Sequence, residues 1–336
     1  MAKNRQASAL KRESFVWPAP DKADKGFLWR EDLQWADPSE EFRSRAYQLP
    51  PFLVWNPEIK RRRYVAVLED AQACFLRFAR LAGPDTPEQR EAIRRFAGRY
   101  GFLTGGRWVA PGAGGEVEPG ESLHFWRQEI QHMAWAVQVL MAMPDPKERI
   151  DDELLRRIIW WQRDRVGYIL TNLPREELLR FRDAWEVFEF VRGEYRRTAK
   201  GGTPEERHRA LFSAGWLAGV GKRDRIFRRV VWGALRRPAL VLLADFIAKK
   251  LAEYPVALRI GMDAEKGELR SFPMPANLLS AMWLLLYRVV AGEAKLKKCA
   301  QCGEWGVAKY SNWRMHPECA NAERQARHRR REKGGD

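Results

Sequence analysis

The chain has 336 residues, of which 45% are apolar, and its 60 Lys and Arg side chains outnumber 44 Asp and Glu to give a net charge of +16. The apolar content excludes general disorder, and the length is sufficient for a buried core in one large domain or two smaller ones. The basic charge favours a polyanionic partner such as nucleic acid.

The first residues, Met1–Arg5, lead into no apolar stretch typical of a signal peptide. No uninterrupted apolar run reaches the roughly 18–20 residues that cross a bilayer. We therefore expect a cytoplasmic protein without a membrane partner, in a reducing compartment that disfavours structural disulfides.

Residues 1–60 are rich in Trp, Pro and charged side chains, and this composition predicts an irregular N-terminal segment. Residues 61–292 carry mainly the 3.6-residue apolar period of helices. Thr86 and Pro87 favour the start of one of them. The glycine-rich residues 104–120 are expected to form a loop. The expected helices span 64–82, 86–100, 121–143, 151–170, 174–199, 204–218, 224–254 with a break at Pro238, and 276–290.

The apolar period changes near residues 256–272. Apolar and polar residues alternate within Val256–Gly261 and again within Glu268–Phe272, and the polar stretch Asp263–Gly267 lies between the two segments. This pattern predicts a β-hairpin. The predicted fold class is therefore mainly α, with a multi-helix body, one β-hairpin and a separate C-terminal module in residues 293–336.

Motifs of catalysis are missing from the sequence, which contains neither H-E-x-x-H nor G-x-S-x-G. His124 and His132, with Glu129 between them, can share a face of the helix expected over 121–143. Without further ligand pairs we interpret them as structural or exposed residues rather than a metal site.

Two further features permit nucleic-acid contact, although a structural role is favoured for each. The chain has 15 tryptophans, and those in apolar helices, such as Trp126 and Trp135, are expected in the core rather than stacked on bases. The basic cluster Lys60–Arg63 is expected to be the solvated start of a helix.

Four candidate metal ligands lie close together near the end of the chain: Cys299, Cys302, His316 and Cys319. They form the pattern C-x2-C-x13-H-x2-C, in which a loop joins two close pairs. Thiolate sulfur and neutral imidazole are the donors that tetrahedral Zn²⁺ prefers, so we expect one structural zinc ion per chain. The alternatives are unrelated residues in a polar tail, or a disulfide or redox pair of the first two cysteines, which leaves the second pair unexplained.

The residues beside these ligands suit a metal site. Gly303 follows the second thiolate, where a flexible residue lets backbone N–H groups turn toward sulfur. Pro317 favours the start of a helix, on which His316 and Cys319 share one face. The remaining cysteine, Cys74, lies in an apolar run and is expected to be a small core residue.

An arginine-rich stretch follows the fourth ligand, and its composition favours a helix. Arg324, Arg327 and Arg331 share one face of that helix, whereas Arg329 and Arg330 point elsewhere. Each guanidinium offers a rigid fork of donors to phosphate, so we expect these five arginines to contact nucleic acid. The alternative is a solvated tail, and phosphate contacts by themselves choose no sequence.

The C-terminal segment resembles the CGNR-type zinc finger, a treble-clef-like module at the C-terminus of bacterial transcription regulators. The matching residues are Cys299, Cys302, Gly303, Trp305, His316, Pro317, Glu318, Cys319, Asn321 and the arginine-rich helix. His316 replaces the family's usual third cysteine, and Cys319–Ala322 keeps only the Cys and the Asn of the naming tetrad. A fainter similarity links Phe96–Leu103 and Glu121–Arg127 to helical regions that precede such fingers.

The resemblance implies a DNA-binding regulator whose N-terminal part senses a ligand or a partner. The residues predict a zinc-binding protein that acts on nucleic acid and that is not an enzyme, and the resemblance implies that the nucleic acid is DNA. Two alternatives stay open. One is a zinc-stabilised docking module for another protein, centred on Trp305 and Trp313, and the other is an enzyme with an unrecognised site in the helical body.

Overall fold

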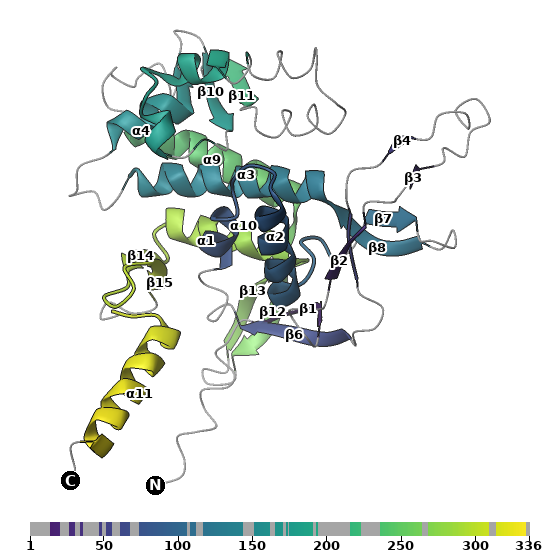
Figure 1. Cartoon of the computed structure of the whole chain (residues 1–336), viewed down its shortest axis with the longest axis vertical. Helices are drawn as coiled ribbons and strands as arrows, with labels where there is room; N and C mark the ends of the chain where they lie inside the picture. Colours follow the sequence, from purple (N-terminus) through teal and green to yellow (C-terminus); the bar gives the residue numbers. More distant parts are fainter. Residues whose placement is uncertain are drawn as a thin grey trace.

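The computed structural model shows a mostly helical protein with several small antiparallel sheets, as the fold class predicts in its broad outline (Figure 1). No helix among the described residues combines the length and the apolar character needed to cross a bilayer. The structure describes residues 14–20, 27–30, 34–35, 47–48, 52–55, 61–67, 74–105, 108–111, 117–143, 151–161, 165–170, 173, 175–190, 193, 216–222, 236–263, 268–308 and 314–333.

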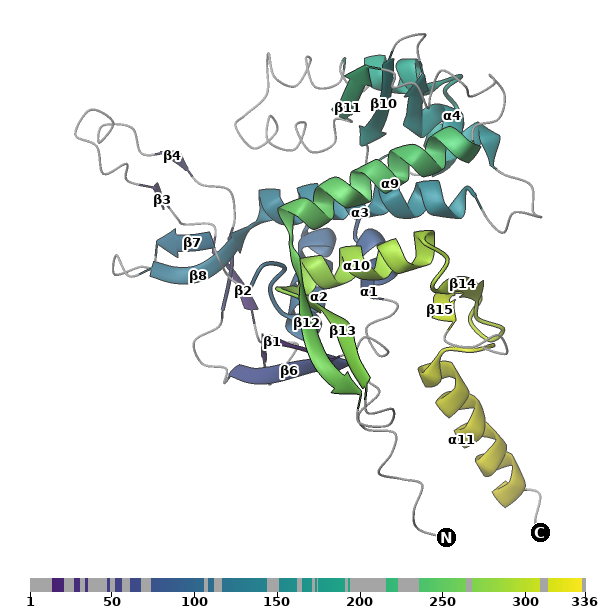
Figure 2. The ribbon, with the colours of Figure 1, turned by 180° about the vertical axis from the view of Figure 1, so that it is seen from behind.

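Three long helices form the centre of the core: α3 (Leu123–Met141), α9 (Arg236–Glu253) and α10 (Leu278–Val290). They cross one another in successive layers, with α9 packed against both α3 and α10 (Figure 2). The Phe246 ring of α9 contacts the rings of Trp135 and Trp283, at centroid distances of 5.1 and 5.6 Å. Both tryptophans are buried, so the prediction that the tryptophans of apolar helices form the core is confirmed for Trp135.

Two shorter helices, α1 (Cys74–Ala79) and α2 (Pro87–Tyr100), complete this core, with α1 packed against α3 and α10. The hydroxyl of Thr86 accepts a hydrogen bond from a backbone N–H in the first turn of α2, and Pro87 occupies the first helical position. The helix ends at Gly101, whose φ of +92° suits glycine. Both ends of α2 therefore lie where the sequence predicts them.

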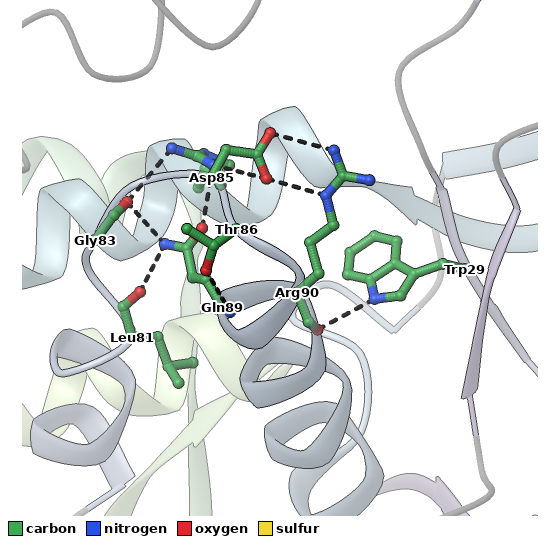
Figure 3. A network of polar contacts seen from close by, with 8 residues as sticks. Trp29, Leu81, Gly83, Asp85, Thr86, Gln89 and Arg90 are labelled. Carbon is green, nitrogen blue, oxygen red and sulfur yellow. Dashed lines mark hydrogen bonds and ion pairs between the residues drawn. The ribbon is translucent and has the colours of Figure 1, made fainter. Parts of the chain in front are cut away.

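A polar network joins the start of α2 to α3 (Figure 3). The carboxylate of Asp85 pairs with Arg127 at 3.1 Å and with Arg90 at 3.0 Å, and the Asp85 and Arg127 side chains are only 2% exposed. Gln89 donates to two carbonyls of the turn before α2, each at 2.9 Å. The indole N–H of Trp29 donates to the carbonyl of Arg90 at 3.1 Å. This network fixes the turn that follows α1.

The small sheets are all antiparallel. Their strand orders are β1–β6, β2–β5–β8–β7, β3–β4, β11–β10–β9, β12–β13 and β14–β15. The strands of the first four sheets are β1 (Ser14–Pro20), β2 (Phe27–Arg30), β3 (Gln34–Trp35), β4 (Tyr47–Gln48), β5 (Phe52–Trp55), β6 (Arg61–Val67), β7 (Trp108–Pro111), β8 (Val117–Ser122), β9 (Ile159–Trp161), β10 (Arg165–Leu170) and β11 (Trp216–Lys222). Two short helices, α4 (Asp152–Ile158) and α5 (Arg175–Leu178), accompany the β9–β11 sheet.

The N-terminal segment differs from the irregular structure predicted for residues 1–60. Its described residues form strands, and the strand β5 pairs with β8 at the start of α3. Phe27 and Leu53 are fully buried in the same core as the helices, and the Phe27 ring lies 4.6 Å from that of Phe102. This segment therefore contributes to the body of the protein.

Three further predictions need correction. Within the range 64–82, residues 64–67 end β6 and residues 74–79 form α1, while residues 68–73 lie outside the described residues. Arg61–Arg63 therefore begin a strand rather than a helix, and Lys60 also lies outside the described residues. The loop predicted over 104–120 contains β7 and β8. The helix predicted over 151–170 ends at Ile158 and is followed by β9 and β10. In each case a distant strand pairs with residues whose local pattern alone favours helix or loop.

Two predicted helices are described only in part. Residues 175–178 and 184–190 are helical within the range 174–199, whereas residues 216–218, at the end of the range 204–218, belong to β11. Residues 179–183 form turns and bends, so the range 174–199 is not one continuous helix. Residues 174, 191–192, 194–199 and 204–215 lie outside the described residues. The helix predicted over 224–254 is described from Arg236, and its Pro238 falls in the first turn, where proline is tolerated.

The predicted hairpin is confirmed as β12 (Val256–Asp263) and β13 (Glu268–Pro275), which lead directly into α10. Asn277 and Ser280 cap the start of α10 through reciprocal hydrogen bonds. One face of the hairpin carries exposed apolar side chains, and Met262 and Leu269 face each other across it at 69% and 73% exposure.

The C-terminal module follows α10 directly. The strands β14 (Lys295–Lys298) and β15 (Trp305–Ala308) form a hairpin, and the helix α11 (Pro317–Lys333) then projects away from the body (Figures 1 and 2). The hairpin packs on the core, since Val307 is buried in it and Leu296 lies against it.

Candidate metal centre

The four predicted ligands come together in the structure. Cys299 follows β14, Cys302 lies in the turn between β14 and β15, and His316 and Cys319 flank the start of α11. Their candidate ligand atoms all lie within 4.8 Å of one another. Ligand atoms of a tetrahedral zinc site lie roughly 3.5–3.8 Å apart, given Zn–S bonds of about 2.3 Å, so the cluster is close to the size that a metal requires.

The first ligand pair sits on a tight turn between the two strands. The backbone N–H of Gly303 donates to the carbonyl of Cys299 at 2.9 Å, and the N–H of Cys299 donates to the carbonyl of Glu304 at 2.8 Å. Gly303 has a φ of +71°, the left-handed region that side chains other than glycine adopt at a cost. The prediction of a glycine turn after the second thiolate is therefore confirmed.

The imidazole of His316 is oriented by a polar neighbour at each of its two ring nitrogens. Its Nδ1 lies 3.4 Å from the Cys302 sulfur, and its Nε2 lies 3.3 Å from the backbone carbonyl of Trp305. A proton on Nε2 donates to that carbonyl and leaves the lone pair of Nδ1 directed into the cluster. Metal-binding histidines are commonly held in this way, with one nitrogen on the metal and the other on a carbonyl.

Two thiols of the cluster have very different pKa values. Burial raises the pKa of Cys299, but hydrogen bonds from the backbone of Cys302, His316 and Gln301 outweigh it and lower the pKa to about 6. Burial and the neighbouring thiols raise the pKa of Cys319 to about 12. In the bare cluster one thiol ionises at the expense of the other, whereas a bound cation stabilises all the thiolates together.

The donor set fits a bound metal ion. Three sulfur donors and one imidazole nitrogen are what a tetrahedral thiophilic metal requires, and they use every member of the cluster. Of the His, Cys, Asp and Glu side chains in the described ranges, these are the ones grouped closely enough to hold a metal. The site can therefore bind a metal ion with Cys299, Cys302, His316 and Cys319.

Two contacts join the metal centre to the body, and the sequence gives no local signal for them. Arg80, in the turn after α1, forms an ion pair with Glu304 of the ligand turn. The ring of Trp305 packs against the core of the body. Both contacts depend on tertiary packing, so only the three-dimensional arrangement identifies them.

The predicted arginines occupy α11, whose first turn contains the ligand Cys319. Arg324, Arg327 and Arg329 are exposed to solvent. Arg327 pairs with Glu323 one turn earlier, and Arg324 donates to the carbonyl of Ala320 at 3.4 Å. The backbone of α11 also includes Arg330 and Arg331.

The other candidate residues lie apart from this centre. Glu129 is buried in the body, where its carboxylate contacts Lys250 at 2.6 Å and Tyr254 at 3.2 Å, and His132 lies 3.3 Å away. These contacts support a structural role for Glu129 and His132. His124, on the same helix, is exposed. Trp313 lies outside the described residues.

Comparison with known proteins finds no match of this chain to any family model, curated protein or solved structure.

Proposed function

We propose that this chain is a zinc-stabilised, nucleic-acid-binding protein that acts on DNA as a regulator. The observation that carries the proposal is the position of two ligands, His316 and Cys319, at the start of the arginine-rich helix α11. A metal bound there fixes the first turn of α11 against the β14–β15 hairpin. Metal binding and the presentation of arginines are thereby joined in one short segment.

The surroundings of α11 support an outward-facing role. The described side chains from Asn321 to Arg329 are exposed apart from Glu323, which is half-buried, so the helix buries little apolar surface of its own. A helix that is polar on all sides gains little from packing, and its high density of guanidiniums suits phosphate. The exposed Lys295 and Lys298 of β14 add positive charge to the same module.

Zinc is the metal that this donor set favours, because three thiolates and an imidazole in a closed tetrahedron are typical of structural zinc sites. The resemblance to CGNR-type fingers supports DNA as the target. The alternative docking module depends on Trp305, yet this ring is half-buried against the body and so leaves less surface for an external partner. We therefore favour the nucleic-acid proposal.

The test is DNA binding by Cys302→Ser, measured by fluorescence anisotropy with a labelled duplex at low salt. We expect the variant to lose its metal and its DNA binding, because a structural zinc site supplies the folding free energy of such a small module. Cys74→Ala is the matched control, since it removes a buried thiol of the body and leaves the ligands intact. Wild-type DNA affinity in Cys302→Ser contradicts the proposal.

A further inference from the structure

A cleft of about 480 Å³ lies between the helical body and the metal-centre module. The turn after α1 and the helix α3 form two of its walls, and Trp305 of β15 contributes a third. Ligand pockets often occur at such junctions, and a volume of about 300–1,000 Å³ is typical of small-molecule sites.

The lining is mainly apolar, with few polar side chains. Val137 and Met141 of α3 face the cleft together with Leu76 of α1 and the Trp305 ring. Gln138 and Arg80 are the polar side chains of the lining. An apolar cavity with a few polar groups accommodates an organic molecule that carries one charged or hydrogen-bonding end.

Arg80 is the charged side chain of this cleft's lining. The Arg80 side chain is 50% exposed and is paired with Glu304, which is itself 48% exposed. Arg77 lies close enough that its charge, together with the larger effect of burial, lowers the pKa of Arg80. The half-exposed guanidinium of Arg80 is therefore the group of this lining that favours an anion.

Arg80 also connects the cleft to the metal centre. Leu76, Arg80 and Trp305 line both this cleft and a smaller cavity of about 160 Å³, whose other walls include the ligands Cys302, His316 and Cys319. The guanidinium therefore stands between an apolar cavity and the metal centre, and it is held there by an exposed carboxylate that an incoming anion can replace.

We infer that this cleft is a binding site for a small apolar carboxylate. The apolar part of the ligand lies against Val137, Met141 and Trp305, and its carboxylate replaces that of Glu304 on Arg80. Guanidinium binds carboxylate through two parallel hydrogen bonds, which favours an anion of this shape over a neutral group. The inference does not rest on nucleic-acid binding, because no nucleic acid takes part in it.

The test uses isothermal titration calorimetry of the full chain with 1-naphthoate and with its neutral analogue 1-naphthamide. We expect naphthoate to bind about threefold more tightly, a difference that suits a partly exposed ion pair. Glu304→Gln removes the competing carboxylate, so naphthoate affinity should rise about threefold while naphthamide affinity is unchanged. Arg80→Gln should abolish the preference for the anion.

Two further variants locate the binding. Ala82→Phe adds a ring at a half-buried position of the lining, so it should weaken the binding of both ligands. Arg95→Gln removes an exposed cation of α2 and should change neither affinity. Equal affinities for the two probes, an anion preference that survives Arg80→Gln, or no heat with either probe at millimolar concentration would each overturn the inference.

Discussion

At Gly303 the chain turns between the two strands that carry the first pair of ligands. Its φ of +71° lies in the left-handed region, and a Cβ built there meets no atom within 4 Å. A substitution at this position therefore costs backbone strain without a steric clash. The left-handed conformation costs about 1–2 kcal/mol for residues with a side chain.

We expect Gly303→Ala to weaken metal affinity about fivefold to thirtyfold, as this strain implies. The measurement is competition with a chromophoric chelator. Gly292→Ala is a matched control, because Gly292 has a similar φ of +80° in the turn after α10, away from the ligands. Equal losses of metal affinity in the two variants contradict a specific role of Gly303 in the metal site.

The ligands themselves could be predicted from the sequence, because C-x2-C and H-x2-C are local patterns with one shared chemistry. The glycine turn and the helix start at Pro317 are local as well. The carbonyl of Trp305 that orients His316, and the pairing of Arg80 with Glu304, are not local patterns. These two contacts form where distant segments pack together, and no local residue pattern predicts them.

The helix α11 is the element on which the nucleic-acid proposal rests most directly. Arg327 is exposed, yet Glu323 pairs with it one turn earlier and offsets part of its charge. Phosphate binding by a single arginine releases about one counterion, which appears in the salt dependence of the affinity.

We expect Arg327→Ala to weaken DNA binding modestly for all sequences and to lower the slope of log affinity against log salt by about one unit. Glu323→Gln is the reciprocal variant, because it frees Arg327 and should strengthen binding. Fluorescence anisotropy over a salt series measures both effects. A slope that Arg327→Ala leaves at its wild-type value would show that Arg327 contacts no phosphate.

The long helices that carry their own start and stop signals could be predicted from the sequence. α2, α3 and α10 lie where their caps and apolar periods place them, and the polar turn of the β12–β13 hairpin was visible too. The strands β1 and β6 were missed because they pair with each other across many residues. A strand stabilised by a distant partner carries only a weak local signal.

In the molecule as a whole, the Asp85–Arg127 ion pair ties the turn after α1 to α3 inside the core (Figure 3). Burial lowers the pKa of Arg127 to about 10, against the opposing effect of Asp85, so the guanidinium remains charged at neutral pH. Removing one partner of a buried pair leaves an uncompensated buried charge, which costs about 3–5 kcal/mol.

We expect Asp85→Asn to lower the free energy of unfolding by about 3 kcal/mol, measured by urea denaturation. Arg95→Gln is the control, since it breaks a long, exposed contact of 3.8 Å with Glu91 on the same helix α2 and should change stability by less than about 0.5 kcal/mol. Similar losses in the two variants would show that burial of the Asp85 pair has no energetic consequence.

A second buried group, Glu129, makes stability depend on pH. Burial raises the pKa of its carboxyl, but His132 and Lys250 together outweigh burial and lower the pKa below the ordinary value of 4.5. A lowered pKa means that the folded state binds the proton less readily than the unfolded chain. The contribution is thus present above pH 4.5 and is lost as the pH falls through the folded pKa.

We expect the unfolding free energy of the wild type to fall below pH 4.5 more steeply than that of Glu129→Gln, which lacks the titrating carboxyl. Urea denaturation at a series of acidic pH values gives both profiles. Glu153→Gln, at an exposed position, should retain the wild-type profile. Parallel profiles for the wild type and Glu129→Gln would exclude this group as a source of the acid sensitivity.

In the proposed function nucleic-acid binding depends on the bound metal, and one measurement tests both. Metal content by mass spectrometry and affinity for a mixed-sequence duplex are determined at about 50 and 200 mM salt, on purified and on chelator-treated protein. We expect one zinc per chain, an affinity that falls about tenfold or more with salt, and loss of binding without the metal. Undiminished binding by the metal-free protein would contradict it.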